Sequence, residues 1–178
     1  MAAKTFGRSA LVGLFLILML STVPSWAQPG DGDPELSRAA AAKEFPRLLT
    51  QWTELDRKLT TVGKEFRASV DPDQRDILRQ QYSDFVQQAK DFLPRLRVAA
   101  VAAYELAPND DPDVTRTVLG LMANDVHGDD YDAAEFLARL LVENKCEEKA
   151  LFGLVGVTTY CLHDFVTAEK YLIKANEV

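Results

Sequence analysis

The chain has 178 residues, with 20 Lys and Arg against 27 Asp and Glu, so its formal net charge is −7 at pH 7. An acidic chain without a local Lys/Arg cluster argues against non-specific binding to nucleic acid or to an anionic membrane surface. The length and the 47% of hydrophobic residues suit one folded domain with a real core.

Residues 1–27 have the parts of a secretory signal peptide. Lys4 and Arg8 make a positive start, and the apolar run over 11–23 is short for a membrane span. Ser25 and Ala27 occupy the small-residue cleavage positions, so we expect cleavage after Ala27. The protein would then be exported, either periplasmic or secreted, without a stable membrane anchor. An uncleaved anchor is the alternative.

A linker rich in Gly, Pro and Asp follows over 28–33, and residues 34–108 are predicted to form a helical hairpin region. Two long helices are expected over 44–69 and 72–106, and the short turn between them makes them antiparallel neighbours. Both carry apolar residues at alternating spacings of three and four, as in a coiled-coil seam. The seam residues are Leu48, Trp52, Leu55, Leu59, Val62 and Phe66, then Leu78, Tyr82, Phe85, Ala89, Phe92, Leu96, Ala99, Ala103 and Leu106.

Prolines mark the boundaries of these helices. Asp33, Asp71 and Asp111 are each followed by Pro and then an acidic residue. In this pattern the Asp caps the helix, the Pro occupies the first helical position, and the acid faces the positive helix end. A short helix over 34–43 is expected to end or bend before Pro46. Pro94 is expected to kink the second long helix near Leu93.

The rear part, residues 109–178, is predicted to contain four shorter helices, over 113–126, 130–143, 147–161 and 165–177. Glu147 and Glu148 are interpreted as acids of a first helical turn. No stretch shows the alternating pattern of a β-strand, and β-branched residues do not cluster. The sequence therefore predicts an all-α protein.

Two segments of this rear part match at an offset of 34 residues: Tyr131-Asp132-Ala133-Ala134 and Phe165-Val166-Thr167-Ala168. This period, with large, small, aromatic and Ala residues in order, resembles the tetratricopeptide helix pair. The resemblance implies two such pairs, with Gly156 and Ala168 allowing close helix approach and Phe165 filling the gap beside them. The second pair carries Phe152, Gly156, Phe165, Ala168, Leu172 and Ala175, and the first carries Val118, Leu121, Tyr131, Ala134, Ala138 and Leu141, with Met122 in place of the small residue.

A second resemblance covers most of the chain after residue 27. The order of an export signal, a long helical hairpin, the segment over 102–108, and then the segments over 130–134 and 164–172 is similar to the helical N-terminal region of some exported bacterial cyclophilin-type peptidyl-prolyl isomerases. In that family a strand-rich catalytic domain follows. The chain has no Phe-His-Arg-like catalytic segment and no strand-rich half. The resemblance therefore carries over no catalytic residue.

Candidate chemical groups do not assemble into a recognised site. Cys146 and Cys161 flank one predicted helix and would lie ~22 Å apart, beyond the reach of a disulfide, so two free thiols are expected, with an intermolecular bridge as the alternative. His127 and His163 lack metal-ligand spacing and are interpreted as cations at helix ends. The acids over 110–113 lack the pattern of a calcium-binding loop. We expect no catalytic residues, no bound metal and no cofactor.

If the tetratricopeptide resemblance holds, one face of the first helices of each pair would line a groove. Its residues would be Arg116, Leu119, Ala123, Val126, Val157 and Tyr160. This mostly apolar strip could hold a peptide or helix, or the hairpin could simply pack against it. On the last helix, Val166, Ile173 and Val178 form a further apolar stripe that either docks a partner or is ordinary exposed surface.

These patterns favour an exported, non-catalytic helical protein-protein interaction module whose partner is a protein or peptide. The alternative is the accessory region of a secreted cyclophilin-type peptidyl-prolyl isomerase, truncated or split from its catalytic domain. A third hypothesis is a homo-oligomeric helix bundle built through the front seams.

Overall fold

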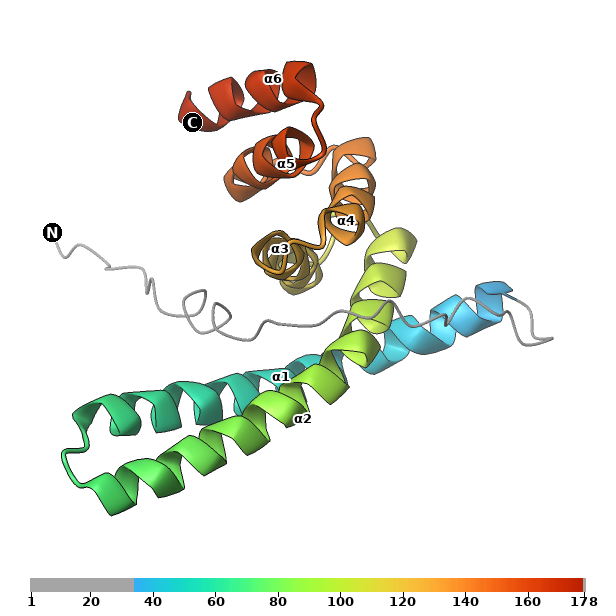
Figure 1. The fold of residues 1–178 in the computed structure, drawn as a ribbon. Helices are drawn as coiled ribbons and strands as arrows, with labels where there is room; N and C mark the ends of the chain where they lie inside the picture. Colours follow the sequence, from blue (N-terminus) through green and yellow to red (C-terminus); the bar gives the residue numbers. More distant parts are fainter. Residues whose placement is uncertain (1–33, 178) are drawn as a thin grey trace, which may run out of the picture. The chain divides into compact units, whose positions relative to one another are not determined.

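The computed structural model describes residues 34–177, which form six helices and no strand (Figure 1). The all-α class predicted from the sequence is confirmed for this part of the chain. The predicted signal peptide (1–27), the linker (28–33) and Val178 lie outside the described residues. Within the described range no helix is long and apolar enough to cross a membrane.

The first helix, α1 (Pro34–Ala68), is continuous, so the predicted end of a short helix before Pro46 is wrong. A proline inside a helix removes one hydrogen bond and crowds the preceding turn, at about 3 kcal/mol or more. Phe45 and Leu48, on either side of it, are both buried, and burying two such side chains offsets a penalty of this size. The Thr50 hydroxyl also donates a hydrogen bond to the Pro46 carbonyl at 2.9 Å.

The second helix, α2 (Pro72–Leu106), likewise continues through Pro94. The described chain divides into two compact units. The front unit is residues 46–96, and the rear unit is residues 34–45 together with 97–177. Both long helices contribute residues to both units.

In the front unit the segments 46–68 of α1 and 72–96 of α2 lie side by side (Figure 1). Leu59 and Ala89 are buried between them, at 5% and 0% exposure, and larger side chains pack around this pair. Asp71 caps α2 as predicted, since its Oδ1 accepts a hydrogen bond from the Asp73 N–H at 3.0 Å. The surrounding side chains are Trp52, Leu55, Tyr82, Phe85 and Val86.

The rear unit contains four shorter helices, α3 (Pro112–His127), α4 (Tyr131–Glu143), α5 (Lys149–Cys161) and α6 (Phe165–Asn176). Successive helices pack against each other, and α5 also packs against α3. Their shared core contains the buried residues Val118, Leu121, Met122, Leu137, Leu141, Leu151, Phe152, Val155 and Ala168. α3 thus packs against two of the other three short helices.

The start of α5 differs from the prediction by two residues. Glu147 and Glu148 lie before the helix, and Glu148 makes no side-chain cap. The reason lies in the preceding turn, where Lys145 has a positive φ of 56° and the Cys146 N–H bonds back to the Leu141 carbonyl at 3.0 Å. This closure uses residues 144–146 to end α4, so the next helix begins later.

The turns between α3 and α4 and between α5 and α6 repeat the same backbone geometry at an offset of 34 residues. Asp129 and His163 have positive φ values of 57° and 65°. The backbone N–H groups of the next residues, Asp130 and Asp164, donate hydrogen bonds to the carbonyl oxygens of the residues five positions earlier in the chain, at 3.0 and 2.9 Å. Their carboxylates then cap the following helices, at Ala133 N–H and Thr167 N–H. The period in the sequence is therefore also a period in hydrogen bonding.

Candidate functional site

The six residues predicted to line a groove do not form one open strip. Leu119 on α3 is buried at 8% exposure, so it offers little surface to a partner. Arg116 is exposed and forms an ion pair with Asp113 at 3.1 Å, whereas Ala123 and Val126 are half-buried. The exposed apolar part is confined to α5, at Val157 and Tyr160.

Phe165 extends this exposed part onto α6. Its ring meets the Tyr160 ring edge-on, with 5.5 Å between centroids, and the His163 ring lies 5.9 Å away. Tyr160 is 58% exposed, Phe165 56% and Val157 41%. We call Val157, Tyr160 and Phe165 the aromatic surface. Phe165 was expected to fill a gap between helices, and its exposure corrects that expectation.

Carboxylates lie at the same end of the rear unit as this surface. The Tyr131 hydroxyl donates to Asp129 at 2.6 Å and also interacts with the Cys161 thiol, so the α3–α4 turn lies beside the end of α5. The Asp129 carboxylate, followed by Cys161, raises the pKa of Tyr131. Hydrogen bonds from Thr167 lower the pKa of Asp164. Asp129, Asp132 and Asp164 are all exposed, and they give this end a negative charge.

The cysteine, histidine and acidic side chains considered as candidate reactive or metal-binding groups do not lie together. Cys146 and Cys161 are free thiols, and burial raises the pKa of Cys146. His127 Nδ1 lies 2.8 Å from the Ala123 carbonyl oxygen of its own helix. Over residues 34–177 no three His, Cys, Asp or Glu side chains are grouped closely enough to hold a metal ion.

A buried ion pair in the rear unit was not predicted from the sequence. Asp125 on α3 is only 4% exposed, and its Oδ1 accepts a hydrogen bond from Nη2 of Arg97 on α2. Its Oδ2 has no partner among the described residues. Burial raises the pKa of Asp125, although Arg97 acts in the opposite direction. The spacing of apolar residues within one helix does not predict which polar residue the fold will enclose.

A series of hydrogen bonds connects two turns at the end of the rear unit opposite the aromatic surface. The Tyr104 hydroxyl donates to Asn109 Oδ1, and Asn109 Nδ2 donates to the Asn144 carbonyl, each at 2.8 Å. Tyr104 is fully buried, and burial raises its pKa to about 12. The contacts join the α2–α3 turn to the α4–α5 turn. They serve to fix the helix ends and contact no candidate surface.

The front unit carries a surface groove of about 680 Å³ between α1 and α2. Leu55 and Phe92 contribute its apolar side chains, and Phe92 stacks on Trp52 with 6.2 Å between ring centroids. Its polar lining consists of Thr50, Gln51, Glu54 and Lys58 on α1 and Gln88, Asp91 and Arg95 on α2. The sequence assigned Leu55 and Phe92 to a buried seam, but both remain half-exposed.

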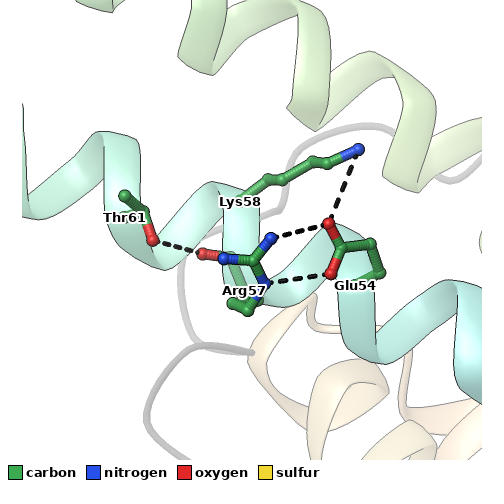
Figure 2. Close-up of polar contacts among 4 residues, drawn as sticks. All are labelled: Glu54, Arg57, Lys58 and Thr61. Carbon is green, nitrogen blue, oxygen red and sulfur yellow. Dashed lines mark hydrogen bonds and ion pairs between the residues drawn. The ribbon is translucent and has the colours of Figure 1, made fainter.

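Figure 2 shows polar contacts on α1 around Glu54 and Lys58, two residues that line this groove. Arg57 donates two hydrogen bonds to the Glu54 carboxylate, at 2.9 and 2.8 Å, and Lys58 Nζ lies 3.8 Å from Glu54 Oε1. The hydrogen bond from Arg57 is the main cause of the lowered pKa of Glu54. Thr61 donates to the Arg57 carbonyl at 2.8 Å. The groove thus has a charged rim above an apolar floor.

Comparison with protein families, with curated proteins and with solved structures found no match. The candidate sites therefore stand on the geometry of this chain alone.

Proposed function

We propose that the protein is an exported, non-catalytic helical module that binds a protein or peptide partner through the aromatic surface of its rear unit. In this proposal α1 and α2 form a helical hairpin, and α3–α4 and α5–α6 are two tetratricopeptide-like pairs. Repeats of this kind build extended binding surfaces rather than reaction centres. The proposal of export rests on residues 1–27.

Two features support the tetratricopeptide-like arrangement. The first is the set of turn and cap hydrogen bonds that repeats at 34 residues. The second is the close contact of α5 with α6 at Gly156, where an added Cβ would lie 2.7 Å from Leu172 Cγ and Cδ2. A helix pair with a small residue at its crossing is what the resemblance implies.

The observation that carries the binding proposal is the exposure of three adjoining apolar side chains. Aromatic residues are strongly represented among the side chains that dominate interface energies. Val157 and Tyr160 lie one turn apart on α5, and Phe165 contacts Tyr160 from α6. Together they offer an apolar anchor site in which no ordering of long flexible side chains is required.

The charge of the rear unit indicates the chemistry of the partner. Residues 97–177 contain 15 Asp and Glu against 7 Lys and Arg, a formal net charge of −8. Asp129, Asp132 and Asp164 place part of that charge at the end that bears the aromatic surface. A segment with an apolar anchor flanked by Lys or Arg is complementary to this surface, and charge complementarity raises the association rate and the specificity.

Amphipathic helical peptides test this directly. Three peptides share the same apolar residues, and their polar positions are all Lys, all Gln or all Glu. We expect fluorescence anisotropy to show the tightest binding for the Lys peptide, with affinity that falls as salt rises. Tyr160→Ala and Phe165→Ala should each weaken binding by about tenfold or more, as expected for loss of an aromatic anchor.

Val70→Ala is the matched control, since Val70 is 95% exposed at the α1–α2 turn and belongs to the front unit. It should leave the affinity unchanged. A scrambled Lys peptide of identical composition measures binding by charge alone. The proposal fails if none of the three peptides binds better than the scrambled one, or if both aromatic truncations leave the affinity intact.

A further inference from the structure

The two helices of the front unit bury aliphatic side chains such as Leu48, Leu59 and Leu96, but they do not fully bury their aromatic side chains. All five aromatic residues between positions 46 and 96 remain partly exposed. In the rear unit Tyr104, Phe45 and Phe152 are buried, at 0%, 3% and 9% exposure, although Tyr160 and Phe165 are exposed. Two helices share a single line of contact, so a wide apolar stripe on each leaves its flanks in water. The five partly exposed aromatic residues are Trp52, Phe66, Tyr82, Phe85 and Phe92.

The groove lies on one such flank. Its floor contains Leu55 and Phe92, both partly exposed, and the Trp52 ring stacks on the Phe92 ring. Burying apolar surface contributes roughly 25 cal/mol per Å². A further pair of helices laid on this flank would therefore gain stability by covering the floor, as in a four-helix bundle.

The charged residues that line the groove restrict which further helices can pack against it. The rim carries Glu54 and Lys58 on α1 and Asp91 and Arg95 on α2, so it has two acids and two bases. The whole front unit contains 9 basic and 8 acidic residues, a formal net charge of +1. A surface that is balanced in this way can face a copy of itself without net repulsion. The rear unit, at −8, would repel its own copy.

We infer that the groove of the front unit is the docking face for a second copy of this chain, in a two-fold symmetric dimer. A symmetric contact uses the same patch on both subunits, so each acid of the rim has a base of the other copy available to it. When the two α1 helices approach antiparallel, Glu54 of each copy faces Lys58 of the other. Leu55 and Phe92 of both copies then form a shared apolar centre.

Charge reversal on the rim gives a test that does not depend on the stability of the core. Glu54 and Lys58 are each 47% exposed, so Glu54→Lys and Lys58→Glu should fold. Each reversal shifts the rim by two charges, to +2 or −2, and two identical altered copies would repel. Sedimentation velocity across a protein concentration series, on the chain as the producing cell processes it, should show a dimer for wild type and monomers for each variant.

Mixing the two variants provides the decisive measurement. A copy with a +2 rim is complementary to a copy with a −2 rim, so the mixture should recover the dimer. Glu65→Lys is the matched control, because it makes the same charge change on an exposed α1 position outside the groove. That variant should dimerise like wild type.

Three results would overturn the inference. The wild-type chain could stay monomeric at every concentration. A wild-type dimer could persist in both rim variants, which would place the contact elsewhere. The mixture could stay monomeric while each variant keeps its helical circular dichroism. None of these results bears on the peptide-binding proposal, which concerns the rear unit.

Discussion

At the scale of single residues, Asp125 is the side chain whose position is hardest to explain by stability alone. A carboxylate that is 96% shielded from water loses hydration that one ion pair only partly replaces, and its Oδ2 has no partner in the described part of the chain. Arg97 is the cation that offsets this loss. The pair is therefore more important for the way α2 meets α3 than for net stability.

Removal of one partner should destabilise the rear unit strongly. Arg97→Met leaves a buried carboxylate unpaired, and we expect a loss of about 3 kcal/mol in the free energy of unfolding, the lower end for a buried pair because Arg97 is partly exposed. The double variant Arg97→Met/Asp125→Leu should recover most of this loss. Urea unfolding followed by circular dichroism measures both. Equal destabilisation in the single and double variants would contradict this account.

The raised pKa of Asp125 also predicts a dependence of stability on pH. Its folded state binds a proton more readily than the unfolded chain, whose Asp pKa is about 3.9. As pH falls through the folded pKa toward that value, the wild type should therefore gain stability relative to Asp125→Asn. Urea unfolding of the two proteins over about pH 7 to 4 checks the sign. A difference that is independent of pH would show that burial does not shift this group.

At the scale of elements, the α5–α6 contact and the turns show how local residue choice sets helix packing. Gly156 allows Leu172 to approach the α5 backbone, and Lys174 Nζ lies 3.9 Å from the centre of the Phe152 ring. The turns, by contrast, place residues other than Gly at positive φ, namely Asn109, Asp129, Lys145 and His163. Close packing is thus favoured by a small residue, while the turns retain some backbone strain.

Two glycines of α5 form a matched pair for testing the close contact. Gly156→Ala places a Cβ 2.7 Å from Leu172 and should destabilise the protein by about 1–3 kcal/mol. Gly153→Ala meets no atom within 4 Å and should stabilise it by up to about 1 kcal/mol, through helix propensity. Thermal unfolding of both variants gives the comparison. A neutral Gly156→Ala would mean that the two helices can separate at little cost.

Backbone strain in the α4–α5 turn is open to a similar comparison. Lys145 has φ of 56°, a conformation that Gly adopts without steric strain, so Lys145→Gly should stabilise the rear unit by up to about 1 kcal/mol. Lys170→Gly, at an exposed position inside α6, should destabilise it by about 1 kcal/mol. Denaturant midpoints of the two variants should therefore move in opposite directions. A shared direction would contradict the role assigned to φ.

At the scale of the whole molecule, two units share the long helices α1 and α2. They differ in net charge and in how many apolar side chains they bury. The front unit is nearly neutral with partly exposed aromatic residues, and the rear unit is strongly acidic with a buried core. Local opening is easier where fewer apolar side chains are buried. The two units should therefore differ in stability, and unfolding of the chain should not follow a single two-state transition.

Hydrogen exchange measured by mass spectrometry tests this difference. On the Lys58→Glu variant, which is expected to keep copies apart, amides in the front unit should exchange faster than those in the interior of α3 to α5. In the wild type at high protein concentration, front-unit protection should rise because the docked copy covers the groove. Equal protection in the two units of the variant would show that two helices suffice to stabilise the front unit.

How much of the fold and of the candidate sites could be predicted from the sequence depends on the range over which each sequence signal acts along the chain. The apolar spacing at Leu59, Val62 and Ala89 predicted helices and their inward faces, and Asp71 and Asp111 predicted caps that the structure contains. These signals act within one or two helical turns. The prediction that a helix ends before Pro46 was wrong, since burial of the neighbouring Phe45 and Leu48 offsets the local penalty of proline.

By itself, the sequence determined that the described chain is helical and where most turns fall, because helix periodicity and capping are short-range effects. Only the tertiary structure decided which residues are covered. It buried Leu119 and Asp125 while leaving Phe165, Phe92 and Leu55 in contact with water. Exposure depends on which helices meet, and that is set by packing between residues far apart in the chain, which the spacing within one helix does not encode.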